Sequence, residues 1–209
     1  MDILSSPFLY NLLQFTVGAM SARKIVINNY STIKSKYKVL DIGCGTGYIV
    51  KYLPDDISYI GIDVNKKYID YAKNKYSNKY SNKYSFICEY NTTESILKYG
   101  SFDMIMMNGL IHHLDDSEVI NILSVAKSTL KDTGSIVGID GCYKNNQDII
   151  SLWMLDNDRG KFVRNRIEYE LLYKKVFNNI FMELRNDISY FPYSYLIWKL
   201  SNNPTNNVY

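Results

Sequence analysis

The chain has 209 residues, with 46% hydrophobic and 22% charged side chains, which is enough apolar material to fill the core of one globular domain. Its formal net charge of +3 is too small to predict a polyanionic partner such as nucleic acid. No apolar run approaches the roughly 20 residues that a membrane-spanning helix needs, so we exclude stable membrane insertion.

Two helices are predicted within residues 1–30. Ser6 and Pro7 are typical of a helix start, because serine caps backbone N–H groups and proline fits the first turn. A second helical stretch runs from about Ser21 to Tyr30. Since this segment precedes the first strand, we expect it to cover the core or to lie over the edge of a ligand site. Arg23 can then reach a ligand carboxylate.

A short apolar strand, Val39–Ile42, runs straight into a turn that contains Gly43, Gly45 and Gly47. Glycines remove side chains from one side of the bend, so a flat polar ligand can lie against bare backbone. Asp63 ends a second apolar strand, Ile57–Ile62, and lies 22 residues after Asp41. An acidic side chain at that place can take the two hydroxyls of a ribose. The pattern predicts a nucleoside-bearing cofactor.

A low-complexity stretch follows the second strand and its helix. Asn-Lys-Tyr-Ser occurs three times, at 74–77, 78–81 and 82–85. A period of four would align the tyrosines along one helical face, so a helix is possible. We favour a surface loop that arose by repeat expansion, and we assign it no function.

Three further strands alternate with helices in the middle of the chain. The strands are predicted at Phe86–Glu89, Phe102–Asn108 and Ser135–Asp140, and the longest helix at Asp116–Leu130. This alternation indicates a parallel sheet with right-handed crossovers. Residues 141–177 then read as helix, loop and helix, and residues 178–200 as an antiparallel hairpin at the sheet edge. The polar tail, residues 201–209, is expected to fray.

The spacing of the glycines distinguishes between two cofactor classes. A dinucleotide fold uses Gly-x-Gly-x-x-Gly, which would require glycine where the chain has Tyr48. The run Val39-Leu40-Asp41-Ile42-Gly43-Cys44-Gly45-Thr46-Gly47 instead resembles motif I of the class I S-adenosylmethionine-dependent methyltransferases. Asn108–Asp115 and Leu130–Gly134 resemble the same family's segments after its fourth strand and before its fifth. Residues 140–143, 155–164 and 187–195 more weakly resemble a bacterial subset of the family without an assigned substrate.

The resemblance implies a Rossmann-like α/β fold, doubly wound around a mostly parallel seven-stranded sheet whose last strand is antiparallel. It implies a single domain over residues 1–209, divided as follows: a helical flank (1–30), a cofactor-binding half (31–140), a helical lid between strands five and six (141–177), a terminal hairpin (178–200) and the tail (201–209).

Cofactor-binding residues are implied position by position, with S-adenosyl-L-methionine as the cofactor. These are Asp41, Gly43, Cys44, Gly45, Gly47, Asp63, Val64, Glu89, Tyr90, Asn108 and Gly109. Glu89-Tyr90 departs from the family, which usually has Gly-Asp near the adenine amine. A helix cap is the alternative role for Asp63.

The only two histidines, His112 and His113, follow the fourth strand and are candidate catalytic bases. The alternative is that they pack under the cofactor. Asp140 and Tyr143, at the end of strand five, are candidate substrate contacts. A group of arginines in the lid can clamp an anion or form a solvated charged loop: Arg159, Arg164 and Arg166.

We therefore expect a methyltransferase that acts by in-line displacement on an oxygen, nitrogen or carbon atom of a small molecule. The alternatives are methylation of a lipid or quinone precursor at a membrane surface and a non-catalytic S-adenosylmethionine-binding scaffold. The segment after strand four lacks the Asn/Asp-Pro-Pro-Tyr/Phe of base-methylating enzymes, which argues against nucleic acid. The three cysteines have no metal-binding spacing, and their odd number, with the lack of a signal peptide, favours a cytoplasmic protein without a metal site. We also expect a monomer or a weak homodimer.

Overall fold

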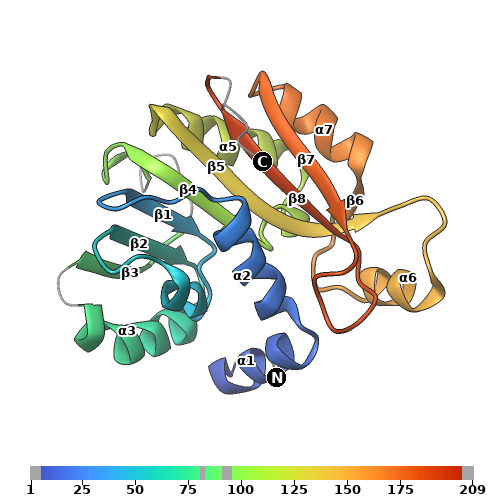
Figure 1. Cartoon of the computed structure of the whole chain (residues 1–209), viewed down its shortest axis with the longest axis horizontal. Helices are drawn as coiled ribbons and strands as arrows, with labels where there is room; N and C mark the ends of the chain where they lie inside the picture. Colours follow the sequence, from blue (N-terminus) through green and yellow to red (C-terminus); the bar gives the residue numbers. More distant parts are fainter. Residues whose placement is uncertain (1–5, 81–82, 91–95, 204–209) are drawn as a thin grey trace.

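Seven strands form one sheet in the order β3-β2-β1-β4-β5-β8-β7 (Figure 1). The computed structural model describes residues 6–80, 83–90 and 96–203. The strands are β1 Lys38–Ile42, β2 Ser58–Asp63, β3 Tyr84–Cys88, β4 Phe102–Asn108, β5 Leu130–Tyr143, β7 Asn179–Arg185 and β8 Tyr195–Ser201, and a two-residue strand, β6 Arg164–Asn165, pairs with the end of β5.

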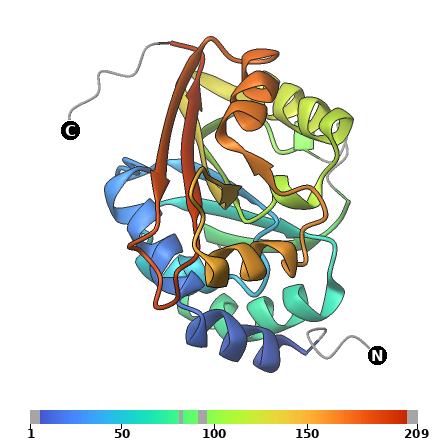
Figure 2. The ribbon, with the colours of Figure 1, turned by 90° about the vertical axis from the view of Figure 1, so that its right-hand side faces the viewer.

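Helices cover both faces of the sheet (Figures 1 and 2). They are α1 Pro7–Thr16, α2 Ala19–Asn29, α3 Lys66–Tyr80, α5 Asp116–Ser128, α6 Ile149–Asp156 and α7 Arg166–Lys174, with 3₁₀ helices η2 Tyr48–Tyr52 and η4 Ile111–His113. Side chains of α5 and α7, among them Leu123 and Tyr169, pack into one core cluster. Side chains of α2, η2 and α3, among them Val26 and Ile69, pack into the other. Each sheet face is thus buried, as near-continuous apolar strands require.

The predicted fold class is confirmed. Strands β3, β2, β1, β4 and β5 run parallel, and β8 runs antiparallel to both of its neighbours, β5 and β7. The predicted terminal hairpin is present, with the last strand inside the sheet and β7 at its edge. The strand order reverses between β1 and β4, and the carboxyl ends of strands at such a point form a ligand crevice in open α/β sheets.

The prediction of a surface loop for the tyrosine repeat is wrong over residues 74–80. Helix α3 continues to Tyr80, and Tyr76 is only 3% exposed because its ring packs on Phe86, 6.1 Å between centroids. Tyr84 lies in β3 and packs on Tyr59. The repeat therefore supplies core side chains to a helix and a strand, which repetition alone did not reveal.

Smaller differences concern element boundaries. The stretch after the glycine turn is a 3₁₀ helix, η2, and β5 begins at Leu130, five residues before the predicted start. Of the predicted tail, Ser201 ends β8, and residues 204–209 lie outside the described part. Among the described residues, no helix is both long and apolar enough to cross a bilayer.

Candidate active site

The turn between β1 and η2 is shaped by three glycines with positive φ: 76° at Gly43, 55° at Gly45 and 68° at Gly47. A Cβ on Gly47 would also lie 2.7 Å from the ring of Phe86, so only glycine fits there. The backbone N–H groups of Gly43 and Cys44 donate to the carbonyl of Ile62 at 2.8 and 3.0 Å. The turn is thereby held against the end of β2.

Asp63 ties the glycine turn to the start of α3. Its Oδ2 accepts from the Gly45 backbone N–H at 2.9 Å, and its Oδ1 accepts from the Asn65 N–H at 2.8 Å. Burial raises the pKa of Asp63, and the two N–H groups oppose that shift. The side chain that caps α3 is Asn65, whose Oδ1 accepts from the Lys67 N–H at 3.0 Å. Each carboxylate oxygen of Asp63 keeps a second lone pair for a ligand hydroxyl.

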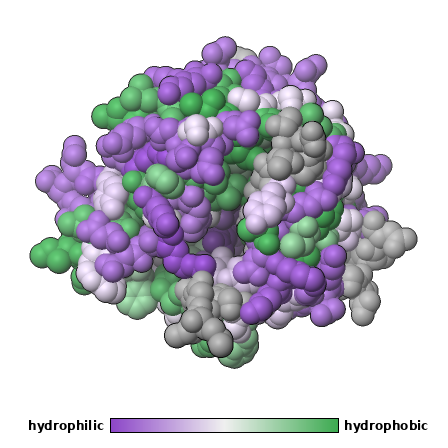
Figure 3. Space-filling model, turned by 180° about the vertical axis from the view of Figure 1, so that it is seen from behind, coloured by the Kyte–Doolittle hydropathy of each residue, from purple (hydrophilic) through white to green (hydrophobic). Residues whose placement is uncertain are grey.

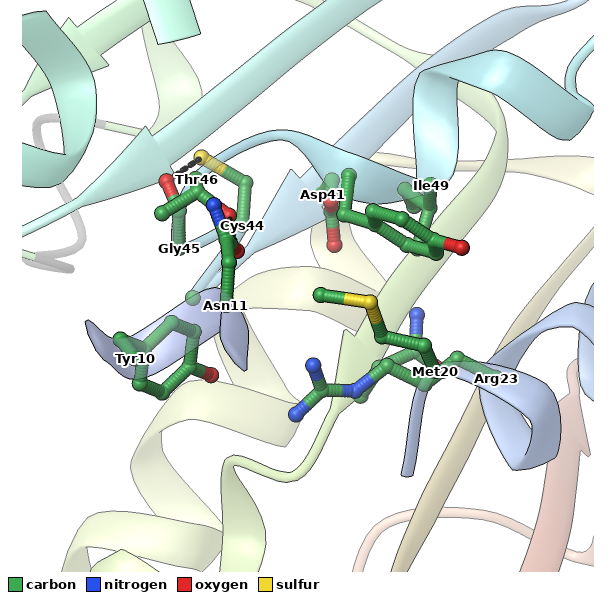
Figure 4. Close-up of a pocket in the computed structure, with 12 residues that line it drawn as sticks. Tyr10, Asn11, Met20, Arg23, Asp41, Cys44, Gly45, Thr46 and Ile49 are labelled. Carbon is green, nitrogen blue, oxygen red and sulfur yellow. Dashed lines mark hydrogen bonds between the residues drawn. The ribbon is translucent and has the colours of Figure 1, made fainter. Parts of the chain in front are cut away.

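A pocket opens between the glycine turn, the end of β4 and the two N-terminal helices (Figure 4). Its lining comprises Tyr10, Asn11, Met20, Arg23, Asp41, Gly43, Cys44, Gly45, Thr46, Tyr48, Ile49 and Asn108. Helix α1 is fastened to the turn by Thr46, whose hydroxyl lies 2.6 Å from Asn11 Oδ1. Figure 4 shows the carboxylate of Asp41 and the guanidinium of Arg23 projecting into the pocket from opposite sides.

Three buried polar atoms of this pocket have no hydrogen-bond partner among the described residues. They are Asp41 Oδ1, Asn108 Oδ1 and Asn108 Nδ2. A buried polar atom without a partner costs about 1–3 kcal/mol, so a ligand that pairs with these atoms gains that free energy. Burial raises the pKa of Asp41 to about 7. Two neighbours oppose this shift: the Tyr59 hydroxyl, which donates to Oδ2 at 2.7 Å, and the positive charge of Arg23.

Arg23 supplies a fixed positive charge beside these atoms. Burial lowers the pKa of Arg23, but its neighbours Tyr10, Tyr195 and Asp41 outweigh that effect and raise it above its ordinary value. The pocket therefore presents a cation next to unpaired acceptors. This arrangement complements a ligand that carries a carboxylate and an ammonium group on one carbon.

The structure groups some of the predicted cofactor residues and separates others. Five of them line the pocket: Asp41, Gly43, Cys44, Gly45 and Asn108. Gly47 and Asp63 support the turn, and Gly109, with φ 74°, lies against Arg23 Nη2. Val64 and Tyr90 are 55% and 78% exposed, and Glu89 is paired with Lys98 at 2.5 Å. None of these last three lines the pocket, so the adenine contacts inferred from the resemblance have no support in this geometry.

The N-terminal segment was expected at the edge of the ligand site, but sequence reasoning did not single out the residues of α1 that line the pocket. Tyr10 and Asn11 face the pocket, whereas Phe8, Leu12 and Phe15 are 70%, 49% and 59% exposed. The helix is thus inverted, with its apolar side outward. The polar residues within an otherwise apolar helix were the available signal for these pocket contacts.

The four predicted catalytic residues differ in accessibility. His112 is 7% exposed and both ring nitrogens face carboxylates; its pKa is raised to about 9, which argues against a base at neutral pH. Asp140 is 1% exposed, with both oxygens occupied, which argues against substrate contact. The Tyr143 hydroxyl donates to Asp156 at 2.8 Å, and its pKa is raised to about 12. His113 is exposed as a residue, but its ring is partly shielded from solvent; this desolvation, together with the neighbouring His112, lowers its pKa to about 4, so it is neutral at pH 7.

The arginines of the predicted lid do not form one clamp. Arg164 is buried, and its guanidinium donates to Asp116 at 2.7 Å and to the carbonyl of Leu114 at 2.8 Å. It holds β6 against the start of α5. Arg159 hydrogen-bonds Tyr68 on α3. No described cluster of His, Cys, Asp and Glu side chains has the arrangement of a metal site.

Comparison with known proteins identifies related folds. The family model described as "Methyltransferase domain" matches residues 39–134. A solved S-adenosylmethionine-dependent methyltransferase from Archaeoglobus fulgidus is 18% identical, with a TM-score of 0.70, and the match covers 93% of this chain and 99% of that one.

Two further structures are methyltransferases by title. The plantazolicin methyltransferase BpumL, solved with S-adenosylhomocysteine, is 16% identical with a TM-score of 0.64; the match covers 92% of this chain and 87% of that one. The mitomycin 7-O-methyltransferase MmcR is 15% identical with a TM-score of 0.66, and this chain, 88% covered, spans 53% of its length. No curated protein sequence matched the chain.

Proposed function

We propose that the protein is a class I S-adenosylmethionine-dependent methyltransferase that methylates a small-molecule acceptor; the family model matched by residues 39–134 and the shared fold support this proposal. Two of the structures named above carry a substrate in their titles: MmcR is a mitomycin 7-O-methyltransferase and BpumL a plantazolicin methyltransferase. The acceptor atom is an oxygen, nitrogen or carbon.

The observation that carries this proposal is the match between the pocket and the methionine end of the cofactor. Arg23 offers a cation for the carboxylate, and Asp41 Oδ1 and Asn108 Oδ1 are buried acceptors for the ammonium group. The side-chain amide of Asn108 also offers a donor. Asp63, hydrogen-bonded to the glycine turn, would accept from the ribose hydroxyls with its remaining lone pairs.

The residues of the chain would bind and orient, and the bound cofactor would supply an electrophilic methyl group on its sulfonium. Proximity and alignment then account for much of the rate. An acceptor hydroxyl would also have to lose a proton, and the neutral ring of the exposed His113 is the better placed of the two histidines to accept it. We assign cofactor binding to residues 31–140 together with Arg23 of α2, and acceptor binding to the rest of residues 1–30 and to residues 141–177.

A second candidate is methylation of a lipid-like acceptor at a membrane surface. Helix α1 contains no charged residue and exposes Phe8 and Phe15, and α6 exposes Ile149 (85%) and Trp153 (65%). Hydrophobic areas interrupt the mostly hydrophilic face in Figure 3. Cosedimentation with phosphatidylcholine vesicles that is lost in Phe8→Ser would favour this candidate over a soluble acceptor.

Isothermal titration calorimetry tests the proposed function directly. We expect S-adenosylmethionine and S-adenosylhomocysteine to bind with one site per chain, and NAD not to bind, because the glycine spacing does not fit a dinucleotide. Equal or exclusive binding of NAD would refute the proposal.

The affinity for the cofactor should fall as the pH is lowered below about 7. Asp41 has its pKa raised to about 7 in the ligand-free pocket, and an ammonium group held against it would lower that pKa. Below pH 7 binding must first remove a proton from Asp41, so the affinity drops by up to about tenfold per pH unit. Titrations of S-adenosylhomocysteine from pH 5.5 to 8 measure this, and Asp41→Asn should flatten the profile. A flat profile in the unaltered protein would place the ammonium group elsewhere.

A further inference from the structure

The imidazole of His112 lies between two carboxylates from distant parts of the chain. Its Nδ1 is 2.7 Å from Asp140 Oδ1, and its Nε2 is 3.3 Å from Asp158 Oδ1. The His112 backbone N–H also donates to Asp140 at 3.2 Å. The Nδ1 contact is a hydrogen bond and the Nε2 contact lies at ion-pair distance; because an ionised carboxylate only accepts, an imidazolium ring satisfies both.

The other oxygens of the two carboxylates are also occupied. Trp198 Nε1 on β8 donates to Asp140 Oδ2 at 2.9 Å, and the Tyr193 hydroxyl donates to Asp158 Oδ2 at 2.8 Å. Burial of two carboxylates near each other is unfavourable unless a cation lies between them. His112 is that cation, and it joins η4, β5 and the segment after α6.

The segment Asp158–Phe162, here called the latch segment, wraps closely around His112. The Phe162 N–H donates to the His112 carbonyl at 2.9 Å, and the Gly160 N–H donates to Asp158 Oδ1 at 2.8 Å. A Cβ on Gly160 would lie 1.9 Å from His112 Cδ2. The backbone of the latch segment therefore lies directly against the imidazole, and its position depends on that ring.

The latch segment also reaches across to the pocket. Arg159 hydrogen-bonds the hydroxyl of Tyr68 on α3. The ring of Tyr68 packs on Tyr10, 4.8 Å between centroids, and Tyr10 lines the pocket. Helices α1, α3 and α6 lie at the same end of the sheet in Figures 1 and 2. A continuous chain of contacts thus runs from His112 through the latch segment to the wall of the pocket.

We propose that His112 is a positioning residue that acts as a cationic latch: by joining Asp140 to Asp158, it holds the latch segment closed beside the cofactor pocket. This role rests on the proposed function only for the identity of the pocket's ligand. It excludes His112 as the general base, because its ring nitrogens are committed to the two carboxylates.

The latch should open at high pH. The groups around the imidazole are Asp140 from β5, Asp158 from the latch segment, the neutral ring of His113 at 4.4 Å and, farther out, Arg159 and Arg23. The two carboxylates raise the pKa of His112 to about 9, from an ordinary 6.5. A raised histidine pKa gives stability that is complete below pH 6.5 and is lost as the pH rises through about 9. Above that pH the neutral ring can donate to only one carboxylate.

Limited proteolysis with trypsin tests the latch without the cofactor. Arg159 and Lys161 are cleavage sites inside the latch segment. At pH 7.5, Asp158→Asn and His112→Gln should each accelerate cleavage at these two bonds at least tenfold, measured by mass spectrometry. The matched control is Asp156→Asn, an exposed carboxylate two residues away whose partner is Tyr143, and it should cleave like the unaltered protein.

Nuclear magnetic resonance of ¹⁵N-histidine in the unaltered protein supplies a second readout. The His112 ring should remain protonated at pH 7.5 and titrate near pH 9, and Asp158→Asn should lower its pKa by at least one unit. A neutral His112 ring at pH 7.5, or unchanged cleavage in Asp158→Asn, would overturn the proposal even if His112→Gln failed to fold. Because neither readout involves S-adenosylmethionine, a failure of the proposed function would leave both results intact.

Discussion

Replacing Arg23 with alanine is expected to weaken S-adenosylmethionine binding by roughly 30- to 3,000-fold. Arg23 is the cation that projects into the pocket opposite Asp41, and the ligand carboxylate would be left buried without its partner. Truncating one partner of a buried, hydrogen-bonded charge pair costs about 2–5 kcal/mol, and each 1.4 kcal/mol is about tenfold in affinity. Calorimetric titration of both proteins at pH 7.5 measures the difference.

Two controls accompany this variant: a truncated ligand and a second substitution in the protein. 5′-Methylthioadenosine lacks the amino-acid part of the cofactor, so its affinity should be the same in Arg23→Ala and the unaltered protein. Lys24→Ala removes the same charge from the exposed side of α2 and should leave both affinities unchanged. If 5′-methylthioadenosine lost affinity to the same extent, Arg23 would act through the fold of the pocket and not on the carboxylate.

Replacing Asp63 with alanine should reduce both stability and affinity. The variant loses two hydrogen bonds from a half-buried carboxylate, to Gly45 and Asn65, which costs about 2–4 kcal/mol and lowers the melting temperature by roughly 5 to 15 °C. It also loses the proposed hydrogen bonds to two ribose hydroxyls, which should weaken cofactor binding by about 100-fold. Calorimetry and thermal unfolding measure the two effects separately.

A ligand analogue separates the ribose contact from the support of the turn. A 2′,3′-dideoxy analogue of S-adenosylhomocysteine should bind the unaltered protein about 100-fold more weakly than the parent compound, and Asp63→Ala should bind the two ligands alike. Asp55→Ala, an exposed carboxylate before β2, is the matched control for stability. An undiminished preference for the parent ligand in Asp63→Ala would restrict Asp63 to holding the turn.

The sheet was largely predictable because its signals are local. Phe102–Asn108 was predicted with both ends correct, since a buried parallel strand is a short, continuous apolar run. The glycine turn and Asp63 were predictable for a similar reason, because their spacing follows from the geometry of one strand–turn–strand unit. The fold class thus followed from local strand, turn and helix signals, and the cofactor class from the resemblance of several short motifs to those of the methyltransferase family.

The surroundings of His112 could not be predicted in this way. Its partners, Asp140 and Asp158, lie 28 and 46 residues away in sequence, and neither has a pattern that marks it as buried. The histidines after strand four were therefore left as candidate bases or as residues that pack under the cofactor, whereas His112 lies between two carboxylates as a cation. The facing of helix α1 could not be predicted for a related reason: a pattern of apolar residues gives their periodicity, and only the tertiary contacts decide which side faces inward.

Strand β8 is synthesised after every other described strand of the sheet, yet it lies between β5 and β7. Trp198 at its centre is fully buried against Gly138 and donates to Asp140. Until β8 docks, β5 is therefore a temporary edge strand, with a row of unpaired backbone groups and with Asp140 Oδ2 lacking its donor, Trp198. Such edges promote intermolecular pairing, and contacts between distant segments form slowly. We expect the nascent chain to depend on chaperones at this stage, and folding yield to be most sensitive to substitutions in the last strand.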